Sequence, residues 1–380
     1  MQTITTRWTK ETGWTWPALA AGSPQLVLYF GATSQLDNEA PAVSELAARF
    51  PQAVVCGCST AGEILGSHVF DDSIVAALVS FNSTRVCAVT QSTADNADSQ
   101  TVGRLAAQKL NGADLRHVLI LSDGLSVNGT ALMSGFRDVL APGVAITGGL
   151  AGDGPRFQKT FVGLGSKVRR DQIVAIGFYG AAIVVSYGSR GGWEGFGPRR
   201  RITRSEGNTL LELDGRPALE LYKRYLGKRA AGLPATGLLF PIELTKDVTE
   251  KAGLVRTILA VDEAKQSLVF AGDMPEGWYA RLMKATGDQL VNGAATAAAD
   301  AAHATSPDGV SLAILVSCVG RRLVLGQRIE EELEAVVRAL PAKTEAVGFY
   351  SYGEACPATG SDFSELHNQT MTITVLSEKS

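Results

Sequence analysis

The sequence predicts an α/β (α+β) fold of two similar halves, each a mixed, partly antiparallel sheet with flanking helices. Within each half, helical and strand-like periodicities alternate at first, and strands without an intervening helix close the unit, which is typical of a mixed sheet. The pattern Gly-x4-Gly-Glu follows an apolar run at 57–63 and again at 348–354, and a similar Gly-acid turn occurs at 148–153. This recurrence indicates a duplicated unit.

Residues 1–24 are predicted to form an irregular segment before the first half, and their tryptophans are expected to cover an edge of its core. The apolar run 25–31 predicts a buried strand, after which Asn38 is expected to cap a helix that Pro51 ends. Val43, Leu46 and Phe50 recur at helical spacing and form one apolar stripe on that helix. The remaining pattern predicts helices at 98–110 and 129–140, and strands at 53–57, 73–81, 85–91, 117–121, 144–148, 158–163, 171–178 and 181–188.

The second half is expected to begin after a glycine- and arginine-rich segment, 189–215, giving domains at 25–205 and 206–380. The basic run 199–204 is interpreted as the solvated guard of an edge strand, with docking of a partner as the alternative. Beyond it the pattern predicts helices at 217–226, 286–303 and 328–340, an extended stretch at 234–244, strands at 256–262, 267–272, 278–283, 311–318, 346–349 and 371–376, and a loop at 319–322.

Composition excludes several classes of protein. A net charge of −3 and a pI of about 5.9 provide no basic field for nucleic acid. The sequence contains no run of apolar residues long enough to predict a membrane-spanning helix. The first ten residues are polar and lack the apolar core of a signal peptide. Five cysteines, an odd number, favour reduced thiols and a cytoplasmic location.

Acidic side chains recur where predicted strands end, and no motif for phosphate binding or for a nucleophile elbow accompanies them. Carboxylates without a matched base or metal motif suggest recognition of amines or hydroxyls, although a carboxylate pair for hydrolysis stays open. Arg321 can hold an anion or pair with the acidic helix 328–340. The candidate ligand-binding residues are Ser59, Thr60, Glu63, Asp123, Asp153, Arg321, Tyr350, Tyr352, Glu354, His367, Asn368 and Gln369.

Cysteine and histidine offer further hypotheses. Cys58 is either a space-filling residue at a strand end or, in the enzyme alternative, a nucleophile. His367 lies in a polar cluster before the last strand and can serve as an axial ligand to haem, with His303 as the alternative. A solvent-facing or hydrogen-bonded histidine is the other interpretation of His367.

Four segments, 57–63, 149–153, 315–321 and 348–354, resemble in this order the landmarks of FIST proteins, and the resemblance covers about 25–378. It implies a FIST N-terminal domain followed by a FIST C-terminal domain. It also implies an intracellular sensory module for small ligands, with amino acids suggested, that acts beside signal-transduction components. One branch of this family, called NosP, binds haem and senses nitric oxide, and regulates a partner histidine kinase or cyclic-di-GMP enzyme.

Like the NosP branch, this chain shows no output domain of its own, so the specific expectation is a sensor that binds haem b, senses nitric oxide, and regulates a histidine kinase, diguanylate cyclase or phosphodiesterase. No haem-ligand motif of that branch can be matched residue by residue, and His367 is the preferred haem ligand, with His303 as the alternative. A homodimer is among the expected partners. The first alternative is a sensor of an amino acid or another small metabolite without haem, and the second is a hydrolase that uses Cys58 or the carboxylates. For either sensor, we expect the two turns with the Gly-x4-Gly-Glu pattern, which contain Glu63 and Glu354, to converge on one cavity.

Overall fold

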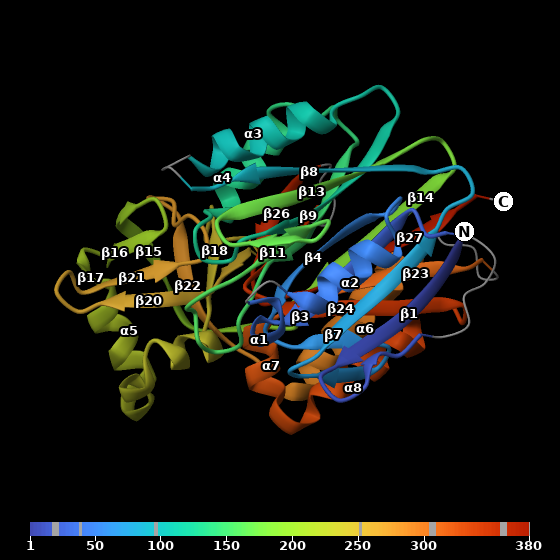
Figure 1. Ribbon diagram of the computed structural model, residues 1–380. Coiled ribbons are helices and arrows are strands. Elements are labelled where there is room, and N and C mark those ends of the chain that lie inside the picture. Colours follow the sequence, from blue (N-terminus) through green and yellow to red (C-terminus); the bar gives the residue numbers. More distant parts are fainter. Residues whose placement is uncertain are drawn as a thin grey trace.

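Figure 1 shows the computed structural model of the chain, which describes residues 1–16, 23–37, 40–94, 98–250, 253–303, 309–357 and 363–379. Three mixed sheets with helices on their outer sides form the main body. A fourth sheet, on the left of Figure 1, is built from residues 194–284, which we call the insertion. The predicted α/β class with mixed sheets and flanking helices is confirmed.

The main body consists of three consecutive units. Unit 1 contains β1 (Gln2–Thr9), β2 (Gly13–Trp14), β3 (Leu26–Ala32), α1 (Thr33–Leu36), α2 (Pro41–Arg49), β4 (Val54–Thr60), β5 (Glu63–Leu65), β6 (His68–Phe70) and β7 (Ile74–Ser80). Unit 2 contains β8 (Arg85–Ser92), α3 (Ser99–Leu110), β9 (Leu115–Ser122), α4 (Gly129–Arg137), β10 (Ala145–Leu150), β11 (Val162–Leu164), β12 (Lys167–Arg169) and β13 (Gln172–Tyr179).

Unit 3 begins with β14 (Ile183–Arg190) and resumes after the insertion. It then contains α6 (Gly287–Ala302), β23 (Ser311–Cys318), α7 (Val319–Leu325), η3 (Gly326–Arg328), α8 (Ile329–Ala339), β24 (Thr344–Ser351), β25 (Gly353–Pro357), β26 (Ser364–His367) and β27 (Met371–Glu378). The insertion contains β15 (Glu194–Glu206), β16 (Thr209–Leu213), β17 (Arg216–Pro217), α5 (Ala218–Leu226), η1 (Gly227–Gly232), η2 (Ala235–Leu239), β18 (Ile242–Thr245), β19 (Leu254–Arg256), β20 (Ile258–Asp262), β21 (Ser267–Phe270) and β22 (Tyr279–Lys284).

The three units share one strand topology. A helical connection joins a parallel pair in each, namely β3 with β4, β9 with β10, and β23 with β24. The last strand of each unit, β7, β13 or β27, is antiparallel to the first member of that pair, and β1, β8 or β14 adds beyond it. The repeated unit that the glycine motif indicates therefore occurs three times.

Each unit lends a hairpin to the sheet of another unit. The β5–β6 hairpin of unit 1 pairs with β24 of unit 3, the β25–β26 hairpin of unit 3 pairs with β10 of unit 2, and the β11–β12 hairpin of unit 2 pairs with β4 of unit 1. This cyclic exchange gives each of the three sheets strands from two units. The predicted boundary at 205/206 falls inside β15, one residue before its end, and β15 pairs with β16 within the insertion.

The first glycine of each repeated motif occupies the same place. Gly57, Gly148 and Gly348 lie directly opposite Tyr29, Ile120 and Leu315 on the neighbouring parallel strand. A Cβ atom would stand 2.0, 2.0 and 1.9 Å from the carbonyl oxygens of those three residues. Because no other side chain fits such a gap, the glycines in the sequence motif are explained by close approach of the two strands.

The inner faces of the three sheets enclose one apolar core. Phe30 of unit 1 stacks on Phe349 of unit 3 with ring centroids 4.8 Å apart, and Leu119 of unit 2 belongs to the same buried cluster. The outer faces are covered separately, by α2 in unit 1, by α3 and α4 in unit 2, and by α6 and α8 in unit 3 (Figure 1). The three units therefore fold around one shared interior.

Three local expectations are wrong. The irregular segment predicted for residues 1–24 is wrong at its start, because residues 2–8 of β1 pair with β7. Residues 319–322 are not a loop, since they begin α7. The basic run 199–204 does not guard an edge, because β15 lies between β22 and β16 and its arginines pair with Asp214, Glu243 and other acids nearby. Asn38, the expected helix cap, lies outside the described residues.

Within the described part of the chain, no helix is both long and apolar enough to cross a membrane.

Candidate ligand-binding site

The segments that follow the second parallel strand of each unit meet at one place. We call them the corner loops, residues 59–63, 150–154 and 350–354. The Ala61 amide donates to the Tyr350 carbonyl at 2.8 Å, and the Gly152 amide donates to the Ser59 carbonyl at 3.0 Å. The Tyr352 amide completes the set by donating to the carbonyl of residue 150 at 3.1 Å. The three corner loops therefore contact one another, but of the two corners with a Gly-x4-Gly-Glu motif only 59–63 lines the neighbouring cavity, so the expected common cavity is met in part.

Glu63 and Glu354 occupy equivalent positions in units 1 and 3. Each accepts a hydrogen bond of 2.5 Å from the hydroxyl three residues earlier, Thr60 in one case and Ser351 in the other. Each also accepts bonds of 3.1 Å from the amide and 2.9 Å from the hydroxyl of the residue before the unit's last strand. The two acids thus tie the corner loop to the strand that closes each unit, and both are buried.

Unit 2 uses Asp153 and Asp123 in different ways. Asp153 accepts from the amides of 157, 158 and 159, and Tyr352 of unit 3 donates its hydroxyl to it. Asp123 accepts from the Thr160 hydroxyl at 2.9 Å and from the amides of 125 and 126 at 2.8 Å. Both buried acids are therefore fully engaged in shaping the loops of unit 2.

A cavity of about 560 Å³ opens beside the meeting point of the corners. That volume lies within the usual range of small-molecule sites, about 300–1,000 Å³. Its walls come from the ends of β3, β4, β10 and β23, so loops of all three units line it: Ala32, Thr33, Ser34, Thr60, Ala61, Gly62, Glu63, Asp71, Asp72, Gly154, Pro155, Arg156, Lys159, Val319, Arg322 and Leu323. A more open cavity of about 570 Å³ shares Ser34, Asp71 and Asp72 with it.

Charges of both signs line this cavity, and they differ in how firmly they are paired. Arg322 forms two hydrogen bonds to Asp71, of 2.9 and 2.7 Å, and another to the Ala61 carbonyl. Arg156 reaches Asp153 only at 3.9 Å and its side chain is 53% exposed. Asp72 accepts one hydrogen bond, from the Ser34 hydroxyl at 3.0 Å. Arg156 and Asp72 therefore have the most capacity left for a ligand.

Gly62 is required where unit 1 turns into the cavity. Its φ of +134° lies in a region that other residues avoid, and a Cβ there would stand 2.2 Å from Arg322 Nη1. The glycine therefore lets the corner loop pass beneath the Arg322 guanidinium.

Glu63 and Glu354 give the protein a pH dependence of known sign. Burial raises the pKa of each carboxyl from 4.5 to about 7, against hydrogen bonds that favour the charged form. Between these values the folded state holds more protons than the unfolded state, so the unfolding free energy falls as the pH rises from about 4.5 to about 7. When the pH is raised from 5 to 8, we expect the free energy of unfolding of Glu63→Gln, and likewise of Glu354→Gln, to increase by about 1–3 kcal/mol relative to that of the wild type.

Urea unfolding of the wild type and both variants at the two pH values measures this difference. A wild type that becomes more stable relative to both variants as the pH rises would contradict the assignment.

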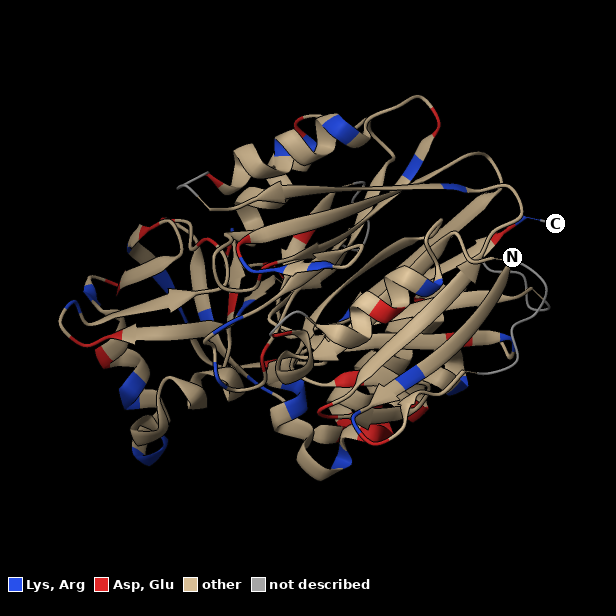
Figure 2. Cartoon of the chain, in the orientation of Figure 1, with Lys and Arg blue, Asp and Glu red and all other residues tan. Residues whose placement is uncertain are grey.

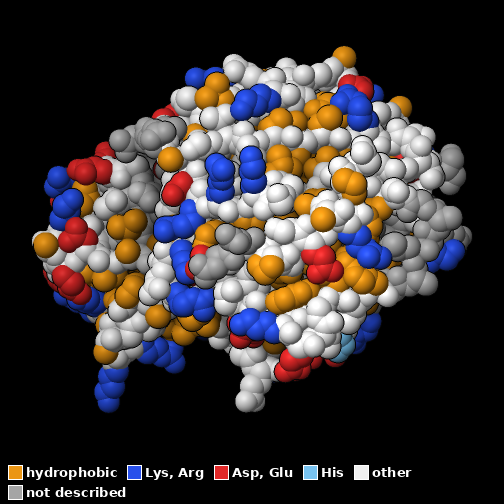
Figure 3. All heavy atoms as spheres, viewed as in Figure 1, with side chains coloured by type: hydrophobic (Ala, Val, Ile, Leu, Met, Phe, Trp, Pro, Cys, Tyr) orange, Lys and Arg blue, Asp and Glu red, His pale blue; other side chains and the backbone are white. Residues whose placement is uncertain are grey.

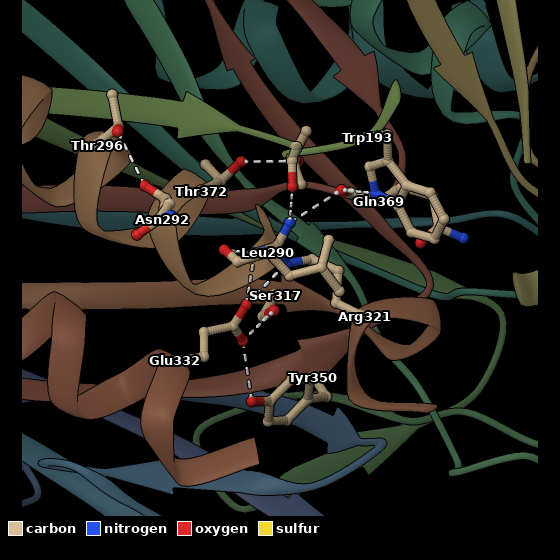
Figure 4. Close-up of polar contacts among 12 residues, drawn as sticks. Trp193, Leu290, Asn292, Thr296, Ser317, Arg321, Glu332, Tyr350, Gln369 and Thr372 are labelled. Atoms are coloured by element: carbon tan, nitrogen blue, oxygen red, sulfur yellow. Dashed lines mark hydrogen bonds and ion pairs between the residues drawn. The ribbon is translucent and has the colours of Figure 1, made fainter. Parts of the chain in front are cut away.

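Several predicted ligand residues do not line the cavity. Arg321 is fully buried and its guanidinium bonds to Glu332, with its Nε 2.8 Å from Oε1 (Figure 4). It also donates to the carbonyls of Gly191, where the chain leaves the main body, and Leu290, where it returns from the insertion. Of the two interpretations of Arg321, the ion pair with the acidic helix is the one observed, and anion binding by this residue is unsupported.

Asn368 and Gln369 hold the insertion against unit 3. Gln369 donates to the Leu238 carbonyl at 3.0 Å and to the Thr257 hydroxyl at 3.1 Å, and both of those residues belong to the insertion. Asn368 accepts from the Thr257 amide at 3.5 Å. The polar cluster in the sequence therefore forms a contact between the insertion and the main body.

Neither candidate haem ligand lines the corner-loop cavity or the smaller cavity beside residues 364–366. His367 places Nε2 3.0 Å from the Cys356 carbonyl, and burial lowers its pKa to about 4. The neighbouring cavity, bordered by residues 364–366, measures about 210 Å³, and His367 does not line it. His303 places Nδ1 on the Ala299 carbonyl at the exposed end of α6.

Cys58 lies in the shared core, and burial raises the pKa of its thiol. Because a thiolate is the reactive form, these surroundings disfavour a nucleophile and match the space-filling role.

Comparison with family models decides the identity of the fold. The FIST N domain matches residues 25–216, and the FIST C domain matches residues 218–357. The chain belongs to the FIST family. FIST domains are sensory domains that bind ligands. Comparison with curated proteins yields no match.

The FIST domain limits differ from the structural units. FIST N spans unit 1 from β3 onward, unit 2, β14 and the start of the insertion. FIST C begins inside the insertion and ends in the exchanged hairpin of unit 3. Thr60 and Glu63 are the predicted ligand residues that line the cavity of this FIST protein. Sequence reasoning missed Asp72, Arg156 and Arg322, although each follows a strand end within a few residues.

Proposed function

We propose that this FIST protein is a sensor that binds a small zwitterionic metabolite, such as a free amino acid, in the cavity beside the corner loops. The observation that supports this most is the cavity itself, where loops of three units bring opposite charges together. An amino acid carries a carboxylate and an ammonium group on one carbon. Arg156 can pair with the carboxylate and Asp72 with the ammonium group, since neither has a strong partner.

Binding of the ligand is coupled to the rest of the molecule by its position. Each unit contributes one wall, so a ligand that contacts all three stabilises one arrangement of the units over others. We propose that this change is transmitted to a partner such as a histidine kinase, diguanylate cyclase or phosphodiesterase.

A basic surface beside the cavity is the face that we propose for the partner. Figure 3 shows Lys and Arg side chains gathered toward the middle of the viewed face, and Figure 2 shows basic segments in the region where Figure 1 labels β11. In β12, which pairs with β11, and directly after it, Lys167, Arg169 and Arg170 are exposed and form no ion pair within the described part of the chain. Such a surface favours an acidic partner face.

Haem-linked nitric oxide sensing stays a prediction of the family resemblance, and the described residues do not fit haem well. Nε2 of His367 is held by a carbonyl, so it carries the proton and cannot at the same time bind iron. We therefore route no step of the proposed function through haem.

Arg156→Gln tests the proposed ligand. Because a hydrogen bond to a charged group contributes about 1.5–3 kcal/mol, we expect the variant to bind its amino acid at least tenfold more weakly. The wild type is first screened against the free amino acids by thermal shift, and hits are titrated by calorimetry. Lys167→Gln removes the same charge outside the cavity and is expected to bind normally.

Two outcomes would count against this function. The first is the absence of any amino-acid-induced stabilisation, or equal affinity of Arg156→Gln and the wild type. The second is a Soret band after haem addition that His367→Ala removes, which would favour the haem alternative.

A further inference from the structure

A second cavity, of about 210 Å³, lies where the insertion meets unit 2 and the exchanged hairpin of unit 3. Its walls are Thr130, Met133, Ser134, Arg137, Leu244, Leu254, Arg256, Asp273, Pro275, Trp278, Ser364, Glu365 and Leu366. None of these residues lines the corner-loop cavity. Most of the wall is apolar. The cavity is smaller than the usual range for small-molecule sites, about 300–1,000 Å³, so it suits a ligand with few atoms.

Arg256 is the buried charged residue among the four that line this cavity, the others being Arg137, Asp273 and Glu365. It is only 3% exposed, yet within the described part of the chain no carboxylate lies within ion-pair distance of it. Its guanidinium donates to the carbonyl of Leu366 at 3.0 Å and to those of Asp273 and Val255 at 3.4 Å. Nη2 makes no hydrogen bond to any described residue.

This environment is costly for a cation. Burial lowers the pKa of Arg256 to about 10, although Asp273 and Glu365 at longer range favour the charged form. Buried guanidinium groups in proteins are normally paired with a carboxylate, because carbonyl dipoles alone compensate the charge incompletely. Arg321, which is also buried, shows the normal arrangement, because its guanidinium forms an ion pair with the carboxylate of Glu332.

Thr130 lines the same cavity and carries an unpaired hydroxyl. Its Oγ1 is buried and has no hydrogen-bond partner among the described residues. Thr130 Oγ1 lies near the guanidinium of Arg256, since a Cβ atom placed on Gly272 would stand 2.8 Å from Thr130 Oγ1 and 2.9 Å from Arg256 Nε. An unpaired hydroxyl and a buried cation without a carboxylate partner therefore lie close together at the wall of one cavity.

We propose that this cavity is a second binding site, for a small monocarboxylate with an apolar body. The carboxylate pairs with Arg256 and accepts the Thr130 hydroxyl, and the body contacts Trp278, Leu254 and Met133. A dianion such as phosphate fits less well, since Asp273 and Glu365 also line the site. Occupation joins the insertion to units 2 and 3, so the ligand acts as a link between the insertion and the main body.

Calorimetric titration of the full chain with benzoate tests the site, with benzamide as the uncharged analogue. We expect benzoate to bind and benzamide not to bind. Thr130→Val is expected to lower the affinity for benzoate at least tenfold, because it removes a hydrogen bond to a charged group. Gly272→Ala is expected to weaken benzoate binding strongly, because its methyl group would clash with Thr130 Oγ1 and Arg256 Nε and displace both groups. Arg201→Gln, an exposed arginine of the insertion outside the cavity, is expected to bind as the wild type does.

Arg256→Lys, checked for folding by circular dichroism, is expected to lose binding as well, and Thr130→Val and Gly272→Ala decide the question if it does not fold. Absence of benzoate binding to the wild type, binding of benzamide with similar affinity, or unchanged affinity in both Thr130→Val and Gly272→Ala would overturn the proposal. Amino-acid titrations of the same variants report on the corner-loop cavity separately, so failure of one site does not imply failure of the other.

Discussion

Arg321→Met is expected to lower the free energy of unfolding by about 3–5 kcal/mol, the usual cost of removing one partner from a buried ion pair. Arg321 and Glu332 are both fully buried, and Nη2 of Arg321 lies 2.5 Å from Oε1 of Glu332. Without the guanidinium, Glu332 retains only hydrogen bonds from the hydroxyls of Ser317 and Tyr350. The carbonyls of Gly191 and Leu290 lose their donor too, which loosens both connections to the insertion.

Urea unfolding followed by circular dichroism measures the loss, and a double variant separates its causes. Arg321→Met combined with Glu332→Leu removes both charges, so we expect it to regain part of the stability that the single variant loses. Arg338→Gln is the matched control, because Arg338 pairs with Glu334 on the exposed side of the same helix at 3.2 Å. Its expected effect is below about 1 kcal/mol. An Arg321→Met variant as stable as this control would show that the buried pair contributes little.

Separating the chain between residues 216 and 217, the junction of the two FIST domains, is expected to abolish folding of both pieces. The first piece keeps units 1 and 2, but β5 loses β24, β10 loses β25 and β14 loses β27. The second piece loses the same pairings from the other side. The shared core is divided as well, including the stacked rings of Phe30 and Phe349. Neither piece retains a closed core, so we expect each alone to be unfolded or aggregated.

The pieces are expected to assemble when produced together, because every broken pairing can re-form between chains. Cooperative thermal unfolding of the first piece alone, followed by circular dichroism, would contradict the exchange of hairpins as the organising feature of the fold.

The sequence by itself determined most elements and the repeat. Glycine at 57 and 348 marks the close approach of parallel strands, and the acids at 63 and 354 mark the turn that follows. These signals are local, since they depend on the backbone and neighbours within a few residues. The sequence therefore predicts the corner loops at strand ends, where the structure has them. It does not reveal β1, most of whose residues are polar, or α7, which is only seven residues long.

Only the tertiary structure decided which strands meet and which side chains share a cavity. The hairpin 63–70 pairs with a strand about 280 residues later in the chain, and no periodicity within either segment specifies that partner. Arg156 and Asp72 face one cavity because hairpin exchange brings loops of different units together, and Arg321 turns inward because Glu332 lies buried beside it. Pairing across such distances is set by burial of the shared core, which is a property of the whole chain.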